Sequence, residues 1–241
     1  MSWINTTKKS PNFGPRKHDR GPDLLVLHYT AMKSCDAAID RLCDPNAEVS
    51  AHYVISETGA VHQLVDEEMR AWHAGAGRWG DVMDVNSHSI GIELANATTE
   101  ALALPFPNAQ IQALERLMRQ IMARHPAITE DRVIGHSDMA PTRKFDPGAK
   151  FDWRRLALGG LSIWPKDVLQ IGACSADQFL RDARTFGYTC EGATFDAVLA
   201  AFRMRFLPML RGPLCAQDCA VMAALARDYP AKAIDARPIT A

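Results

Sequence analysis

The 241-residue sequence has no long apolar run and no block of like charge. Charged residues interrupt every apolar run well short of the about 18 residues that a transmembrane helix needs. The 27 Lys and Arg residues nearly balance the 28 Asp and Glu residues, which leaves a net charge of −1. A chain without a strong basic bias gives no reason to expect binding to nucleic acid or to an anionic membrane. We therefore expect neither a membrane span nor a nucleic-acid partner.

The N-terminus also lacks the apolar core of a secretory signal. Its first residues, "MSWINTTKKSPNFGPRKHDRGPD", are polar and rich in Pro and Gly. We expect a cytoplasmic protein. The alternative is the periplasm or the cell envelope, if a signal has been removed. The sequence leaves the oligomeric state open between monomer and homodimer.

No C-x-x-C pair occurs among the cysteines, which argues against a redox motif or a closed zinc site of that type. In a chain of this size, free thiols in a reducing compartment are the simplest interpretation, with disulfides as the alternative. We predict free thiols at all six positions: Cys35, Cys43, Cys174, Cys190, Cys215 and Cys219.

Strands and helices alternate along the first two thirds of the chain. "DLLVLHYT" (23–30) and "SIGIELAN" (89–96) have the composition of strands, and "SAHYVISETGAVHQLV" (50–65) has that of a hairpin. "SCDAAIDRLCD" predicts a helix capped by Ser34, and "NAQIQALERLMRQIMARH" (108–125) predicts an amphipathic helix. A further strand, "DRVIGHSD", is expected to end at His136. This pattern predicts an α/β fold with a mixed central β-sheet flanked by helices.

Beyond a Gly- and Pro-containing segment, "ALGGLSIWPKD", the pattern becomes purely helical, at about 175–187, 194–206 and 216–228. Three short helices predict a small C-terminal bundle. The expected organisation is an N-terminal extension (1–20), a catalytic α/β domain (21–156), a linker (157–170), a three-helix domain (171–232) and a tail (233–241).

Polar residues follow the predicted strands at positions suited to metal binding. His28, His136 and Asp146 lie at or just past strand ends, where one edge of a sheet can bring them together. Two imidazoles and one carboxylate are a common catalytic ligand set for Zn²⁺, with the fourth position left for water. Spacing alone does not select these ligands, because five other histidines compete: His52, His62, His73, His88 and His125.

Two charged residues could complete such a centre. Glu93 alternates with Ile90, Ile92 and Leu94, so it faces away from the apolar side of its strand and could act as a general base. Lys144 precedes Asp146 by two residues, and a cation there would stabilise an oxyanion. Each residue could instead be an ordinary exposed or hydrogen-bonded side chain.

Five ordered motifs resemble the zinc-dependent N-acetylmuramoyl-L-alanine amidases of the type 2 family, which share the peptidoglycan recognition protein fold. They are "LLVLHYTAM", "SAHYVISETGAVHQLV", "AWHAG", "SIGIELAN" and "VIGHSDMAPTRKFDPGAKFDW", spanning about residues 20–155. The resemblance implies that His28, His136 and Asp146 hold one zinc ion per chain. It also implies that Glu93 is the catalytic acid/base and Lys144 the transition-state stabiliser.

Further motif residues are candidates for contact with substrate. Trp72 and His73 could line the cleft, Tyr29 could flank the scissile bond, and Asn96 and Arg143 could bind carboxylates of a peptide. His52 is expected to face inward in a structural role, and Asp138 to hold the backbone of its loop.

The C-terminal stretch, with its "GY" turn and "AFRMRF" helix, resembles the three-helix peptidoglycan-binding domain. The combined resemblance implies a hydrolase of peptidoglycan fragments that cleaves between (1,6-anhydro-)N-acetylmuramic acid and L-alanine in cell-wall recycling. Muropeptides and anhydromuropeptides are the expected partners. The alternatives are a non-catalytic muropeptide sensor and a zinc peptidase that acts on stem peptides.

Overall fold

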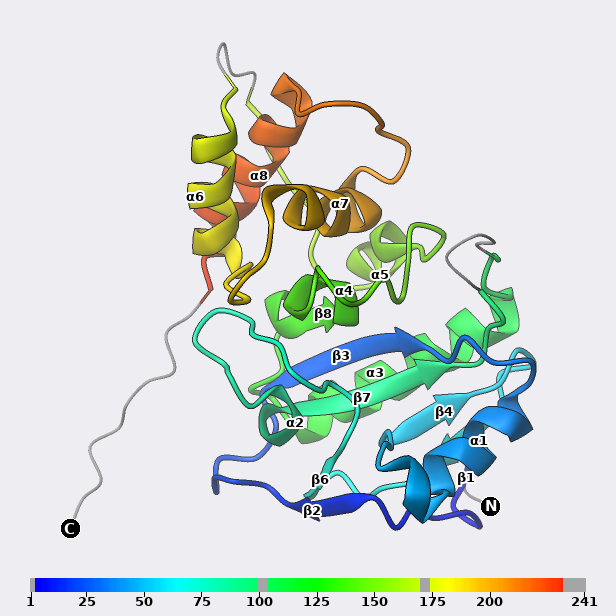
Figure 1. Cartoon of the computed structure of the whole chain (residues 1–241). Helices are drawn as coiled ribbons and strands as arrows, with labels where there is room; N and C mark the ends of the chain where they lie inside the picture. Colours follow the sequence, from blue (N-terminus) through cyan, green and yellow to red (C-terminus); the bar gives the residue numbers. More distant parts are fainter. Residues whose placement is uncertain (1–2, 99–103, 170–173, 232–241) are drawn as a thin grey trace, which may run out of the picture.

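The computed structural model describes residues 3–98, 104–169 and 174–231. A six-stranded mixed sheet with the order β1-β5-β4-β7-β3-β8 forms its centre, and β2 and β6 form a separate antiparallel pair (Figure 1). The strands are β1 (Ile4–Asn5), β2 (Phe13–Pro15), β3 (Leu24–Tyr29), β4 (Tyr53–Ile55), β5 (Val61–Gln63), β6 (Met69–Ala71), β7 (Ser89–Leu94) and β8 (Val133–Gly135). The predicted α/β class and mixed sheet are confirmed.

Helices cover both faces of this sheet. The α-helices are α1 (Cys35–Cys43), α2 (Val85–His88), α3 (Asn108–Arg124), α4 (His136–Met139), α5 (Trp153–Leu158), α6 (Ala176–Phe186), α7 (Phe195–Phe206) and α8 (Ala216–Asp228). Short 3₁₀ turns lie at η1 (Pro45–Ala47) and η2 (Glu130–Arg132). Within the described ranges, no helix combines the length and the apolar character required to cross a bilayer.

The first four residues of strand β3 are aliphatic, and both faces of the strand are covered. Leu25 and Leu27 pack towards α3, whereas Leu24 and Val26 belong to the cluster that contains the C-terminal helices. Burial on both faces is typical of strands in a parallel arrangement, and β3 is parallel to both neighbours, β7 and β8. The fifth residue of the strand, His28, is therefore carried into the interior by its apolar neighbours.

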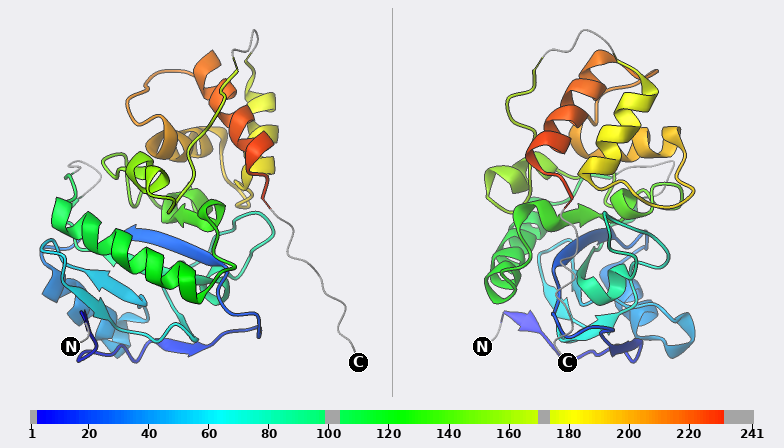
Figure 2. Two further views of the ribbon diagram at one scale, coloured as in Figure 1. Left: turned by 180° about the vertical axis from the view of Figure 1, so that it is seen from behind. Right: turned by 90° about the vertical axis from the view of Figure 1, so that its left-hand side faces the viewer.

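The long helix α3 lies across the rear face of the sheet (Figure 2). Its buried residues recur at helical spacing: Ile111, Leu114, Leu117, Met118 and Ile121. They contact the face of β7 formed by Ile90, Ile92 and Leu94. The predicted amphipathic helix and the predicted alternation of β7 are both confirmed.

Two features near the chain's predicted boundaries differ from the expectation. The segment predicted as an N-terminal extension contributes β1, which pairs with β5, and β2, which pairs with β6. His136 does not end a strand, because β8 stops at Gly135 and His136 is the first residue of α4. Strands of two or three residues are too short to show a periodic pattern.

The helices α6, α7 and α8 form the predicted C-terminal bundle and pack on the sheet (Figures 1 and 2). One apolar cluster contains Val26 and Ile134 of the sheet together with Phe179, Phe202 and Leu225 of the bundle. The segment predicted as a linker also contributes to the interior, through the buried side chains of Leu161 and Ile163. The predicted tail, 233–241, lies outside the described residues.

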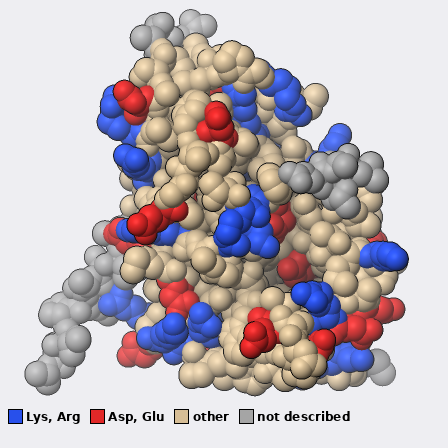
Figure 3. Space-filling view, in the orientation of Figure 1, with Lys and Arg blue, Asp and Glu red and all other residues tan. Residues whose placement is uncertain are grey.

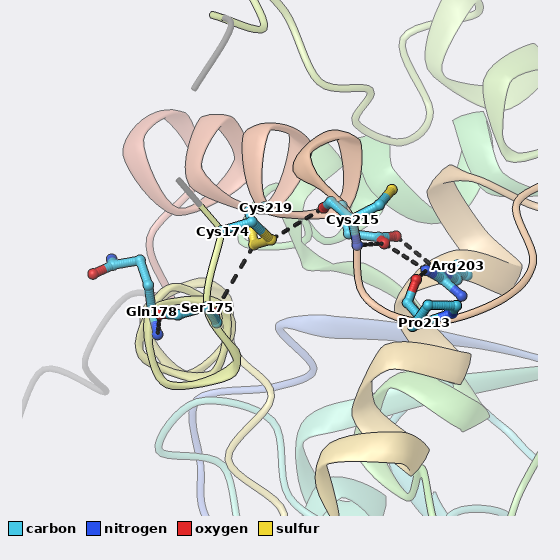
Figure 4. Close-up of a disulfide and its surroundings, with 8 residues drawn as sticks. Cys174, Ser175, Gln178, Arg203, Pro213, Cys215 and Cys219 are labelled. Carbon is cyan, nitrogen blue, oxygen red and sulfur yellow. Dashed lines mark hydrogen bonds and ion pairs between the residues drawn. A yellow bond between two sulfur atoms is a disulfide. The ribbon is translucent and has the colours of Figure 1, made fainter. Parts of the chain in front are cut away.

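The prediction of six free thiols is wrong for two of them. Cys174, two residues before α6, and Cys219, in the first turn of α8, form a disulfide (Figure 4). Their Cα atoms lie 5.8 Å apart although 45 residues separate them in sequence, because α6 and α8 pack side by side. Cys35, Cys43, Cys190 and Cys215 are free, as expected.

Candidate active site

Parallel pairing of β3, β7 and β8 assembles the centre of the site. His28 on β3 is the register partner of Glu93 on β7, so the two side chains lie on the same face of adjacent strands. Leu27 pairs with Gly135, which places His136 directly beyond the end of β8 and next to His28. The carboxyl ends of three strands thus bring residues from distant parts of the chain to one edge of the sheet.

Three buried side chains converge at this edge. Asp146 Oδ2 lies 2.9 Å from His28 Nδ1 and 3.1 Å from His136 Nδ1, and the two Nδ1 atoms are 2.9 Å apart. Neighbouring ligands of a tetrahedral zinc ion with bonds of about 2.0–2.1 Å are roughly 3.3 Å apart. Within the described ranges, these three residues are the cluster whose donor atoms could hold a metal ion.

The hydrogen bonding of His136 supports this interpretation. Its Nε2 lies 2.9 Å from the carbonyl oxygen of Ala74, which can only accept a hydrogen bond, so Nε2 carries the proton. In the neutral ring Nδ1 is then unprotonated, and its lone pair faces the other two ligand atoms. Lone pairs that converge in this way are suited to binding a cation.

The electrostatics favour the forms that bind metals. Burial, together with the nearby His136, lowers the pKa of His28 to about 4, although Asp146 opposes the shift. Burial alone would raise the pKa of Asp146, but the adjacent His136 and His28 rings lower it well below its usual range. At neutral pH the site therefore offers a neutral imidazole and an ionised carboxylate, the forms that bind divalent cations.

Glu93 lies beside this centre in a water-poor environment. Burial and the negative charge of Asp146 raise the pKa of its carboxyl group to about 8, with Lys144 acting in the opposite direction. Its Oε2 is buried without a hydrogen-bond partner among the described residues. A carboxyl group with a pKa near neutrality and an unsatisfied oxygen beside the reaction centre is suited to accept and return a proton.

A cleft of about 420 Å³ opens above these residues. Tyr29, Trp72, Arg143 and Lys144 line it, together with the three ligands and Glu93. Figure 3 shows this hollow with acidic atoms inside it and basic side chains on both sides. Arg41 on α1 and the half-exposed Phe145 also line the cleft. The sequence interpretation gave neither residue a role, although Phe145 lies within one of the family motifs.

Three of the expected substrate residues have polar atoms engaged within the protein. Arg143 Nη2 donates to the backbone carbonyl oxygens of Ala74 and Ala76. Asn96 is 4% exposed, and its side-chain oxygen accepts a hydrogen bond of 2.8 Å from the Thr98 backbone N–H, which fixes the loop after β7. His73 lines the cleft, but its Nδ1 lies 3.0 Å from His28 Nε2 and its Nε2 lies 3.1 Å from Ser89 Oγ.

Apart from His73, the histidines that competed for the metal site either have other partners or lie elsewhere in the sheet. His52 Nδ1 accepts from the Gly91 backbone N–H at 3.0 Å, in the inward structural role expected for it. His88 contacts Asp23 at 3.1 Å, and His125 contacts Glu67 at 2.8 Å. His62 lies on the distant strand β5.

Contacts from the C-terminal bundle hold the segment that carries His136, which includes α4. Asp138 on α4 accepts from the Gly135 backbone N–H at 2.8 Å, as expected for a residue that holds its loop. Tyr188 and Arg205 each donate to the same carboxylate at 2.7 Å. The sequence interpretation missed these two partners because nothing in their local pattern indicates what they contact.

With this geometry in view, comparisons with known proteins identify the family. The family described as N-acetylmuramoyl-L-alanine amidase (Amidase_2) matches residues 18–149. The chain belongs to this amidase family. The predicted family and its hydrolase class are thereby confirmed, while the resemblance of the C-terminal bundle to a peptidoglycan-binding domain stays a prediction.

Individual relatives extend the match beyond this segment. The N-acetylmuramoyl-L-alanine amidase AmiD of Escherichia coli is 34% identical over 233 residues, covering 86% of this chain and 83% of AmiD. The 1,6-anhydro-N-acetylmuramyl-L-alanine amidase AmpD of Haemophilus influenzae is 35% identical, covering 61% of this chain and 87% of AmpD. The crystal structure of AmpDh3 from Pseudomonas aeruginosa matches with a TM-score of 0.80 and 32% identity, covering 94% of this chain and 98% of that one.

Proposed function

We propose that this amidase hydrolyses the amide bond between N-acetylmuramic acid, or its 1,6-anhydro form, and L-alanine in peptidoglycan fragments. The observation that carries the proposal is the convergence of His28, His136 and Asp146 beside the buried carboxyl group of Glu93. One zinc ion per chain is the proposed metal, because two imidazoles and one carboxylate with an open position are a catalytic zinc ligand set.

When bound, zinc would supply a Lewis acid that polarises the scissile carbonyl and activates water. Glu93 takes the proton of the attacking water as the new C–O bond forms. It then returns that proton to the amine nitrogen of L-alanine as the C–N bond breaks. The raised pKa makes the ionised carboxylate a stronger base for taking the proton, which the resulting carboxylic acid can then pass to the amine.

Lys144 stabilises the negative charge that develops on the carbonyl oxygen. Lys144 lines the cleft together with the ligands, and its positive charge acts to lower the pKa of Glu93, which supports a role beside the reacting atoms. Preorganised charge of this kind is commonly worth about 10²–10³ in rate. Trp72 and Tyr29 offer aromatic surfaces to the sugar or the peptide, and Arg143 offers a cation to the carboxylates of the stem peptide.

The anhydro form is the favoured substrate. One solved relative is described as a complex of AmiD with the substrate anhydro-N-acetylmuramic acid-L-Ala-D-gamma-Glu-L-Lys, at a TM-score of 0.78 and 33% identity. Another is AmpDh3 in complex with anhydromuramic pentapeptide. Fragments of this kind place the enzyme in cell-wall recycling.

Product analysis tests the proposal against its two alternatives. Purified enzyme with zinc should release free stem peptide and intact anhydromuramic acid from anhydromuropeptides, and a chelator should stop the release. Cleavage within the stem peptide would indicate a peptidase instead. Tight binding without any product would indicate a sensor.

The cellular compartment is a separate question. The cytoplasm is the compartment expected from the sequence, but the Cys174–Cys219 disulfide favours the alternative, the periplasm or cell envelope, because such bonds persist in oxidising compartments. Thiol titration of the unfolded protein checks the bond. We expect four reactive thiols without reductant and six after reduction, and six in both samples would remove this argument.

A further inference from the structure

The motif "AWHAG" supplies hydrogen-bond acceptors to both histidine ligands. The Ala74 carbonyl accepts from His136 Nε2 at 2.9 Å, and the adjacent residue, His73, places its Nδ1 3.0 Å from His28 Nε2. One short segment between β6 and α2 therefore contacts the outer edges of both rings that face the metal position.

The hydrogen bonds around His73 can be assigned donor by donor. Ser89 Oγ lies 2.6 Å from the Val85 carbonyl oxygen, so the single hydroxyl proton of Ser89 is donated there. Ser89 Oγ must then accept from His73 Nε2, at 3.1 Å. A neutral imidazole has one N–H, so His73 Nδ1 is unprotonated and accepts from His28 Nε2.

This order leaves His28 with a bare Nδ1, the atom that faces His136 and Asp146. We infer that His73 is a positioning residue: it fixes the tautomer and the orientation of His28 so that Nδ1 is presented to the metal. Partners of this kind orient ligands and commonly change metal affinity by about 10–100-fold when removed. The inference rests on the proposed function only in that His28 is a zinc ligand.

The packing of the His73 ring is an independent indication. A Cβ atom built on Gly91 would lie 2.5 Å from His73 Cγ and 2.6 Å from its Nδ1. The ring therefore rests directly on the backbone of β7, and Gly91 provides the space for it. The His73 backbone N–H also donates to Asn86 Oδ1 at 3.1 Å, which fixes the segment from the other side.

Zinc affinity is the first test, measured by competition with a chromophoric chelator. His73→Leu should weaken zinc binding about 10–100-fold, because it removes both hydrogen bonds. His73→Asn should recover most of the affinity, since its Oδ1 can still accept from His28. Ser89→Ala should cause a smaller loss, and the control His62→Leu, on distant β5, should cause none.

Nitrogen-15 NMR of the metal-free wild-type protein is the second test and needs no variant. We expect the Nε2–H tautomer for both His28 and His73. The Nδ1–H tautomer at His28, or unchanged zinc affinity in a folded His73→Leu variant, would overturn the inference. If His73→Leu does not fold, the tautomers of the wild-type protein and the zinc affinity of Ser89→Ala decide whether the inference holds. If the wild-type protein binds no zinc at all, the proposed function fails instead.

Discussion

Glu93 owes its reactivity to its position rather than to its residue type. The alternation of β7 turns Ile90, Ile92 and Leu94 towards α3, which leaves Glu93 on the cleft side beside His28. Its orientation could be predicted from the sequence because the side chains of a strand alternate. Its raised pKa could not, since that shift comes from burial and from Asp146, which is distant in sequence.

Replacement of Glu93 by glutamine should separate catalysis from metal binding. Glu93→Gln keeps the shape of the side chain but removes proton transfer, so we expect kcat to fall about 10²–10⁴-fold. Zinc content should remain that of the wild-type protein, because Glu93 is outside the ligand set. Steady-state kinetics and metal analysis check both results. The exposed Glu130→Gln serves as the control, and a Glu93→Gln enzyme with wild-type kcat would exclude the assigned role.

Between elements, buried polar groups join segments that are far apart in sequence. Glu67, before β6, accepts from Tyr53 of β4 at 2.7 Å and from Arg124 of α3 at 2.6 Å. Burial acts to raise the pKa of Glu67, but hydrogen bonds from Arg124, Tyr53 and His125 outweigh it and lower the pKa to about 2. The folded protein therefore stabilises the ionised form of Glu67 relative to the unfolded chain.

This linkage predicts a pH dependence of stability. Because the folded pKa lies below the unfolded value of about 4.3, the contribution of Glu67 is present above that value and is lost as the pH falls towards 2. Between pH 5 and pH 3 the free energy of unfolding should therefore fall by roughly 1.5 kcal/mol through the protonation of Glu67.

Denaturant unfolding at several pH values measures this contribution. Glu67→Gln should remove that part of the dependence, and the matched variant at the exposed neighbour, Glu68→Gln, should retain it. Equal slopes in the two variants would contradict the assignment.

Sequence patterns predicted single elements better than the contacts between them. The helix α3 and the strands β3 and β7 have enough residues for a hydrophobic period to be visible. The disulfide partner of Cys174 lies 45 residues away, and Tyr188 and Arg205 lie 50 and 67 residues from Asp138, so no local pattern specifies these contacts. The metal ligands were predictable only in part. The chain has eight histidines, and the family motifs rather than the spacing selected His28 and His136 as ligands.

At the scale of the whole molecule, the C-terminal bundle supports the catalytic centre. Arg205 of α7 is 2% exposed, donates to the equally buried Asp138 at 2.7 Å and to the Val133 carbonyl at 2.8 Å, and stacks on Trp153. Asp138 lies on α4, the helix that begins with His136. The bundle is thus connected to a metal ligand through a short chain of buried contacts.

Removal of Arg205 should therefore destabilise the protein and loosen the site. Arg205→Met leaves the Asp138 carboxylate buried without its cation, which commonly costs about 3–5 kcal/mol. We also expect weaker zinc binding, because α4 loses part of its support. Urea unfolding and zinc competition measure the two effects. Arg184→Met on the exposed side of α6 is the control. Exposed charges typically contribute no more than about 1 kcal/mol, so an Arg205→Met variant within about 1 kcal/mol of that control would contradict this view.

The most direct test of the account is the metal content of protein purified without chelators. We predict one zinc ion per chain in the wild-type protein, loss of hydrolysis when a chelator removes it and recovery when zinc is returned. His28→Ala should bind substoichiometric zinc under the same conditions. Protein that carries no stoichiometric metal and cleaves anhydromuropeptides equally well with a chelator present would contradict the account.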